Sequence, residues 1–182
     1  MFAALNVERD RLETARLALE PIQHRHDDDL QEAVIASMPE LERWMPWAPG
    51  HTLATQREFV DRALEAREDG SEHHFAIVLD GRAIGTVGLR RQAPGVYEIG
   101  YWIRSDCAGR GYMTEAAQAV VDLAFTRLGA QRLILNAGVD NTRSLRVAAK
   151  LGFTRAGLLP GGMDGGLGRH FEAYAHELER PD

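Results

Sequence analysis

Apolar and polar positions recur along this chain with two different periods, and the changes of period mark the predicted elements. Alternation by two residues predicts strands, and apolar positions three or four apart predict helices. The predicted strands are 14–21, 74–79, 83–90, 96–104, 132–139, 153–159 and 170–178. The predicted helices are 24–38, 55–68, 113–128 and 141–151. This order predicts an α/β fold around a mixed sheet.

One junction in this order predicts a binding site. Strand 96–104, helix 113–128 and strand 132–139 form a parallel crossover unit. If the two parallel strands splay at their ends, a wedge opens beside the start of the helix. A slender ligand could place its amide groups in that wedge as though it were a further strand.

A glycine-rich turn leads from this strand into the helix. Gly109 and Gly111 allow backbone conformations that a Cβ would forbid. The free N–H groups at the following helix start favour an anion, most often a phosphate. The turn lacks the Gly-Lys-Ser/Thr of a P-loop, and Thr114 stands where the dinucleotide fingerprint needs its third glycine. An ordinary strand-to-helix turn remains the alternative.

Composition narrows the class of protein. The chain of 182 residues is most simply one domain, 1–182, with a net charge of −6 that argues against a general nucleic-acid binder. Its single cysteine, Cys107, cannot form a disulfide within the chain, which favours a reducing, cytoplasmic compartment. No run reaches the ~18 apolar residues of a membrane span. A catalytic thiol at Cys107 has to be considered, although no His/Asp relay accompanies it.

Two clusters of side chains have competing interpretations. Arg104 and Arg110 flank the glycine turn, which supports a phosphate site there. His24, His26 and Asp27 could be metal ligands, but a solvated helix start explains them better, and no metal is expected.

Several short motifs, in this order and spacing, resemble the GNAT family of acyl-CoA-dependent N-acetyltransferases over nearly the whole chain. They are Glu13-Thr14-x-Arg16-Leu17-x-Leu19, Trp44-Met45-Pro46-Trp47, Glu98-Ile99-Gly100-Tyr101-Trp102-Ile103, Gly109-Arg110-Gly111-Tyr112-Met113-Thr114-Glu115-Ala116, and Asn141-x-x-Ser144 before Leu151-Gly152-Phe153. With Met113, the glycine turn is similar to that of the RimJ/RimL branch, the ribosomal-protein N-terminal acetyltransferases. The resemblance implies a mostly antiparallel seven-stranded sheet, splayed at its centre, with helices on both faces.

The resemblance also implies where acetyl-CoA would bind. Its pyrophosphate would lie on the N–H groups of Gly109, Arg110, Gly111, Tyr112, Met113 and Thr114. The strand end at Ile103, Arg104 and Ser105 would pair with the pantetheine arm. An N–H there would stabilise the thioester oxygen by roughly 10²–10³-fold in rate. The family's usual Gln/Arg beside the phosphates is replaced by Ala108, which implies a weaker site rather than a lost one.

The expected chemistry is direct attack of a neutral amine on the thioester. Many family members place a tyrosine general acid at the helix position that Ala148 holds here, so the resemblance implies Ser144 as the acid. Glu98 is the expected base, with a cross-strand ion pair to an arginine as its alternative. Asn141 would bond the cofactor arm, although it and Ser144 also suit the cap of the following helix.

The acceptor is predicted less closely. Trp44 and Trp47 could line an acceptor groove, a dimer surface or the core, and Asp164 lies in the glycine-rich loop 161–168, either a flap or a hairpin tip. We expect the N-terminal α-amine of a ribosomal or similar basic protein. A polyamine acceptor, or a CoA-binding module without catalysis, is the alternative. Family likeness also implies a homodimer.

Overall fold

The computed structural model describes residues 10–181. The strands of the main sheet are β1 (Leu12–Glu13), β2 (Ala18–Pro21), β3 (Glu72–Leu79), β4 (Arg82–Ala93), β5 (Val96–Ile103), β6 (Arg132–Gly138), β7 (Thr154–Leu158) and β10 (Ala173–Glu179). The α-helices are α1 (Asp27–Trp44), α2 (Leu53–Glu68), α3 (Tyr112–Thr126) and α4 (Thr142–Lys150). Short 3₁₀ turns are η1 (His24–His26), η2 (Ala48–Gly50), η3 (Ser105–Cys107) and η4 (Gly166–Gly168). The pair β8 (Met163–Asp164) and β9 (His170–Phe171) forms a small separate sheet.

The main sheet confirms the predicted architecture with one strand more than expected. Its order is β1-β2-β3-β4-β5-β6-β10-β7, and every neighbouring pair is antiparallel except β5 and β6. The predicted strand 14–21 begins only at Ala18, because residues 14–17 form the turn of a tight hairpin. The first arm of that hairpin, β1, is the eighth strand and pairs Leu12 with Leu19. The N–H of Thr14 donates to the carbonyl of Leu17 at 2.9 Å and closes that turn.

Helix α1 is longer than the sequence predicts. The predicted helix ends at residue 38, whereas α1 runs on through Pro39 to Trp44. Proline removes one helical hydrogen bond, but Val34 and Leu41 on the inner side are almost fully buried. Burial of that side therefore outweighs the local break.

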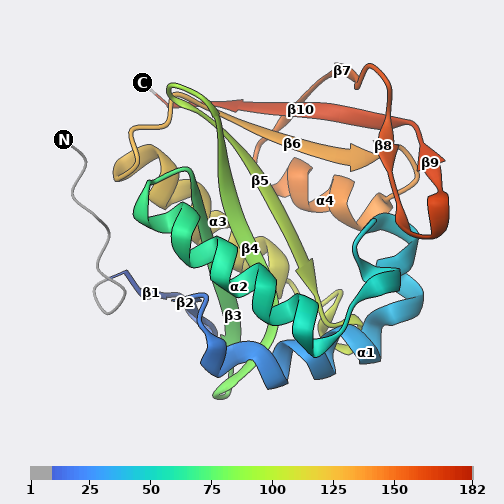
Figure 1. Cartoon of the computed structure of the whole chain (residues 1–182). Coiled ribbons are helices and arrows are strands. Elements are labelled where there is room, and N and C mark those ends of the chain that lie inside the picture. The colour runs from blue at the N-terminus through green and yellow to red at the C-terminus, as the bar shows by residue number, and fades with distance from the viewer. Residues whose placement is uncertain (1–9, 182) are drawn as a thin grey trace.

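The helices cover both faces of the sheet, with α1 and α2 on one and α3 and α4 on the other (Figure 1). Alternation along β5 divides its side chains between the two layers. Tyr97 and Ile99 pack in the large core with α3, whereas Trp102 packs against the clusters of α1 and α2. No helix of the described residues is long and apolar enough to cross a membrane.

The predicted wedge is present between β5 and β6. Parallel pairing is limited to Val96 with Arg132, Tyr97 with Leu133 and Glu98 with Ile134. Beyond these pairs the two strands diverge, as Figure 1 shows. On its side toward β6, the second half of β5 therefore has main-chain N–H and C=O groups that pair with no strand of the described residues.

Candidate active site

A cavity of about 940 Å³ opens at the wedge and is lined from both faces of the sheet. Of the residues singled out in the sequence, its lining contains Trp44, Trp47, Glu98, Ile103, Ser105, Gly109, Gly111, Met113, Thr114, Asn141 and Ser144. The structure thus brings together positions up to 100 residues apart in the chain. Arg104, Arg110, Tyr112 and Asp164 lie outside this lining.

The glycine turn presents a row of main-chain donors to the cavity. Gly109 and Gly111 have φ angles of +77° and +84°, which residues with a side chain rarely adopt. Helix α3 begins immediately afterwards at Tyr112. Among the described residues, no hydrogen-bond acceptor is found for the N–H groups of residues 109–114. Such a row at a helix start is suited to a diphosphate.

The hairpin β1–β2 holds this turn in place, which sequence reasoning missed. The Arg16 side chain donates to Oε2 of Glu115 at 2.7 Å and to the carbonyl of Arg110 at 3.0 Å. The Thr14 hydroxyl donates to the other oxygen of Glu115 at 2.6 Å. Burial raises the pKa of Glu115, but the hydrogen bonds from Thr14 and Arg16 outweigh it and leave that pKa below its usual value. We call these contacts the Arg16–Glu115 clasp.

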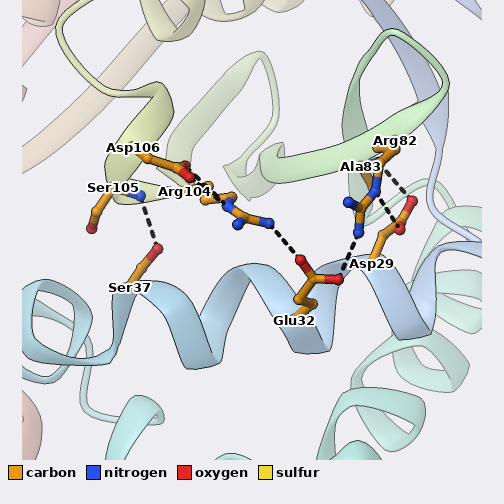
Figure 2. Close-up of polar contacts among 8 residues, drawn as sticks. All are labelled: Asp29, Glu32, Ser37, Arg82, Ala83, Arg104, Ser105 and Asp106. Carbon is orange, nitrogen blue, oxygen red and sulfur yellow. Dashed lines mark hydrogen bonds and ion pairs between the residues drawn. The ribbon is translucent and has the colours of Figure 1, made fainter.

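Helix α1 holds the other side of the same corner (Figure 2). Glu32 accepts hydrogen bonds from Arg104 at 2.9 Å and Arg82 at 2.6 Å, and Arg104 also donates to Asp106 at 2.9 Å. The Arg104 side chain therefore holds the corner, and a main-chain contact of Arg104 with a cofactor stays a prediction. These exposed ion pairs orient the segment more than they stabilise it.

The strand end before the turn has fewer free donors than expected. The N–H of Arg104 donates to the carbonyl of Ile84 at 2.7 Å, and the N–H of Ser105 donates to Oγ of the buried Ser37 at 2.8 Å. Since N–H groups alternate in direction along a strand, those of Tyr101 and Ile103 point away from β4 toward β6. Of the predicted strand-end donors, Ile103 is the one that faces the wedge.

Ser144 lies on α4 beside a residue that the sequence did not indicate. Its Oγ is 2.9 Å from the hydroxyl of Tyr101, which comes from β5 across the wedge. Burial raises the pKa of Tyr101 to about 12, so this phenol is protonated at neutral pH. Asn141 caps α4 by accepting the Ser144 N–H at 3.1 Å. Tyr101 was visible only as part of a motif, because its partner is 43 residues away.

Glu98 lies at the last residue pair before β5 and β6 diverge, and both its oxygens are bonded. One oxygen accepts from Arg90 and Gln92, each at 2.8 Å, and the other accepts from Asn136 at 3.1 Å. The cross-strand ion pair with an arginine is therefore real. The carboxylate still lines the cavity and is 23% exposed.

The predicted acceptor residues divide into two groups. Trp44 packs its ring edge against Phe171 at 5.2 Å, and Trp47 lies 6.0 Å from the Trp102 ring. Both tryptophans line the cavity on the α1/α2 side. Asp164 instead pairs with His170 at 2.9 Å on the small sheet of β8 and β9 and is largely exposed. The glycine-rich loop thus contains a short hairpin.

Two other candidates have ordinary structural explanations. Burial, and then the neighbouring Asp106, raise the pKa of Cys107, which disfavours a thiolate nucleophile. His24 pairs with Asp27 and Asp61, and His26 pairs with Glu20, which ties η1 to its neighbours. Within residues 10–181, no group of three or more His, Cys, Asp or Glu side chains is arranged to hold a metal ion.

The polar groups of the site lie on opposite sides of the sheet. Tyr101 and Ser144 lie on the α3/α4 side, whereas Glu98, Asn136 and the tryptophans lie on the α1/α2 side. A group threaded through the wedge would have proton donors on one side and a carboxylate on the other. This arrangement suits a transfer in which one proton is removed and another is supplied.

The sequence matches the family model described as "Acetyltransferase (GNAT) domain" over residues 16–154. It is 25% identical over 147 residues to the ribosomal-protein-serine acetyltransferase of Escherichia coli, covering 79% of this chain and 82% of that protein. It is 32% identical over 97 residues to the E. coli spermidine N(1)-acetyltransferase, half of each chain. The structure superposes with a TM-score of 0.87 and 20% identity on RimL, a ribosomal L7/L12 α-N-protein acetyltransferase in complex with coenzyme A, covering 93% and 98% of the chains. At that identity the superposition establishes the fold alone.

Proposed function

The chain belongs to the GNAT family and is an acetyl-CoA-dependent N-acetyltransferase, and we propose that its acceptor is the N-terminal α-amine of a polypeptide. A ribosomal or similar basic protein is the proposed source of that N-terminus. The observation that carries the proposal is the pairing of every carboxylate that lines the cavity. Glu40 pairs with Arg143 at 3.1 Å, Glu72 with His74 at 2.6 Å and Glu98 with Arg90 at 2.8 Å.

This pairing separates two classes of acceptor. A polyamine carries several positive charges, and its binding would require carboxylates that are free to face them. Each carboxylate of the cavity already faces a basic group. An acceptor with one reacting amine and an otherwise neutral main chain therefore suits the site better.

The proton chemistry supports the same choice. The oxygens of Glu98 already accept hydrogen bonds from Arg90, Gln92 and Asn136, so the site favours an acceptor that needs little proton removal before it attacks. An α-amine with a pKa of about 7.7–8.0 is roughly a fifth to a third neutral at pH 7.4, whereas a lysine is near 0.1% neutral. The α-amine therefore needs little help from a base, whereas nearly every lysine would have to lose a proton before attack.

The residues present fit acetyl-CoA, which supplies a thioester as the activated acyl group. The N–H groups of residues 109–114 would bind its diphosphate, and the wedge beside Ile103 would hold its amide-bearing arm. The Ile103 N–H would donate to the thioester oxygen, in the role of an oxyanion donor. Asn141 retains its amide N–H groups for the arm while its oxygen caps α4.

Ser144 and Glu98 would divide the proton transfers. Glu98 would accept the proton that the amine loses through a chain of waters, since five residues of strand, ~16 Å, separate it from the Ile103 N–H. The Ser144 hydroxyl would donate to the departing sulfur. Tyr101, which is protonated at neutral pH, can donate to Ser144 Oγ and direct the serine proton toward the sulfur. The amine nitrogen would form the new C–N bond as the C–S bond of the thioester breaks, while one proton leaves the nitrogen and one reaches the sulfur.

The proposal is tested by thiol release from acetyl-CoA with three acceptors: a peptide with a free N-terminus, the same peptide with a blocked N-terminus and an internal lysine, and spermidine. We expect turnover on the first, with mass spectrometry placing one acetyl group on the α-amine. Comparable turnover on the blocked peptide or on spermidine would contradict the proposed acceptor. The reducing compartment and the homodimer stay predictions.

The acid role has its own test. Ser144→Ala should lower kcat by about tenfold or more, with the affinity for CoA unchanged, and Tyr101→Phe should lower it by a smaller factor. In the double variant the effects should not add, because both changes act through one hydroxyl. Thr126→Ala, at the far end of α3, is the control. Full kcat in Ser144→Ala would remove this residue from the mechanism.

A further inference from the structure

Gly100, in the middle of β5, is a glycine that the folded chain itself does not require. Its φ lies outside the left-handed region, so any residue could adopt this backbone. A Cβ built on it meets no atom within 4 Å, and the position is exposed. Glycine weakens a strand interior, and its use there often marks close approach of a ligand or of another backbone. Gly100 lines the cavity, on the same face as Glu98 and Trp102.

Strand β4 continues this surface without side chains, and a side chain of β3 ends it. Gly88 on β4 is the register partner of Gly100, and His74 on β3 is the partner of Gly88. A Cβ at Gly88 would overlap the imidazole of His74, so that ring lies over Gly88. The ring is held by Glu72 at 2.6 Å and by the edge of Phe59 at 5.2 Å. We call Gly100 and Gly88, with His74 as their limit, the glycine strip.

The glycine strip begins where the reaction would occur. Glu98 precedes Gly100 by two residues on the same face, and it belongs to the last residue pair before β5 leaves β6. From β5 to β3 the strip crosses two strand spacings, about 10 Å, which is the length of about three extended residues. Trp102 borders it on the side away from Glu98.

We propose that the main chain of the first residues of the acceptor lies flat on the glycine strip, with its amine at the β5 end, between Glu98 and Ile103, and with His74 limiting its reach. The proposal rests on the proposed function and deepens it. The missing side chain at Gly100 admits an extended polypeptide backbone close to the sheet. A substituent at Gly100 would occupy the space of the acceptor without disturbing the enzyme.

The test adds side chains at Gly100 and measures three quantities: stability to unfolding, the Kd for CoA, and kcat/KM for the free-N-terminus peptide. Gly100→Ala and Gly100→Val should be at least as stable as the wild type and bind CoA within twofold of it. Their kcat/KM should fall in order of size, about tenfold for alanine and about a hundredfold for valine. Ala93→Val is the control, because it also enlarges a side chain at an exposed position of a strand, β4, but lies outside the cavity lining. It should keep kcat/KM within twofold.

A second variant tests the limit of the strip. His74→Ala should raise kcat/KM for peptides with a bulky third residue relative to peptides with a glycine there. Peptide turnover that Gly100→Val leaves unchanged would overturn the glycine strip alone. Turnover of spermidine without turnover of any peptide would overturn the proposed function and the strip together.

Discussion

The two faces of the sheet meet at the wedge, but they are built differently. On the α3/α4 face, the site consists mainly of main-chain N–H groups fixed by the fold, at Ile103 and residues 109–114. On the α1/α2 face, it consists of side chains that pair with one another, such as Glu98 with Arg90. A site made of backbone tolerates changed side chains, whereas a site made of paired side chains changes with each of them. One face can therefore keep a common cosubstrate while the other selects the acceptor.

The largest effect should come from breaking the backbone of the first face. Gly111→Val places a branched side chain at φ +84° and about 3.3 Å from the Arg16 guanidinium. The turn would have to change shape, so the affinity for CoA should fall by more than about a hundredfold, or ~3 kcal/mol. Calorimetric titration with CoA measures this directly. An unchanged Kd would show that the turn does not hold the diphosphate.

Two adjacent histidines of β3 lie on opposite faces of the sheet and show the same difference between the faces. His74 lines the cavity, whereas His73 is buried on the side of Phe75 and Ile77. Burial lowers the pKa of His73 from 6.5 to about 4. As the pH falls, the unfolded chain binds this proton at a higher pH than the folded chain does. The contribution of a neutral His73 to the free energy of unfolding is therefore fully present above pH 6.5 and is lost as the pH falls toward 4. The loss should reach about 3 kcal/mol.

Urea unfolding of the wild type and of His73→Leu between pH 7 and pH 4 measures this term. Between these two pH values, the free energy of unfolding of the wild type should fall by about 3 kcal/mol more than that of His73→Leu. Parallel curves would show that His73 is not held neutral by its surroundings.

The Arg16–Glu115 clasp tests whether the backbone face depends on side chains at a distance. Arg16→Met keeps much of the length of the side chain but removes the donors to Glu115 and to the Arg110 carbonyl. We expect the Kd for CoA to rise by about tenfold, ~1.4 kcal/mol, because the turn is less well ordered before binding. Arg11→Met, on an exposed pair with Glu13, is the control and should leave the Kd unchanged. Equal effects of the two variants would contradict the role of the clasp.

The smallest effect should come from adding a side chain to the backbone face. Ala108→Gln restores the residue type that the family pattern carries beside the phosphates. If main-chain groups already provide most of the affinity, this change should lower the Kd for CoA by only about threefold. A gain of a hundredfold would mean that side chains dominate this face as well.

The sequence predicted what depends on local pattern and missed what depends on distant pairing. The period of apolar positions and the glycines at 109 and 111 predicted the sheet, the wedge and the glycine turn at the start of α3, since each depends on adjacent residues. The clasp joins positions 99 residues apart, and the Tyr101–Ser144 contact joins positions 43 apart, so neither had a local signal. The extension of α1 to Trp44 was hidden by Pro39, whose local effect was outweighed by burial. Glu98 was predicted as the base, with an ion pair to an arginine as the alternative, but its three partners come from β4 and β6 and had no local signal.

The short pairing of β5 with β6 has a consequence for the mechanics of the molecule. Three residue pairs join the part of the sheet before residue 104 to the part formed by β6, β10 and β7. Under load this seam should open first, and amide hydrogens of β6 should exchange with solvent sooner than those of β4. A bound cosubstrate that contacts both strands would join the two parts of the sheet. The enzyme should therefore resist unfolding by force most strongly when its cosubstrate is bound.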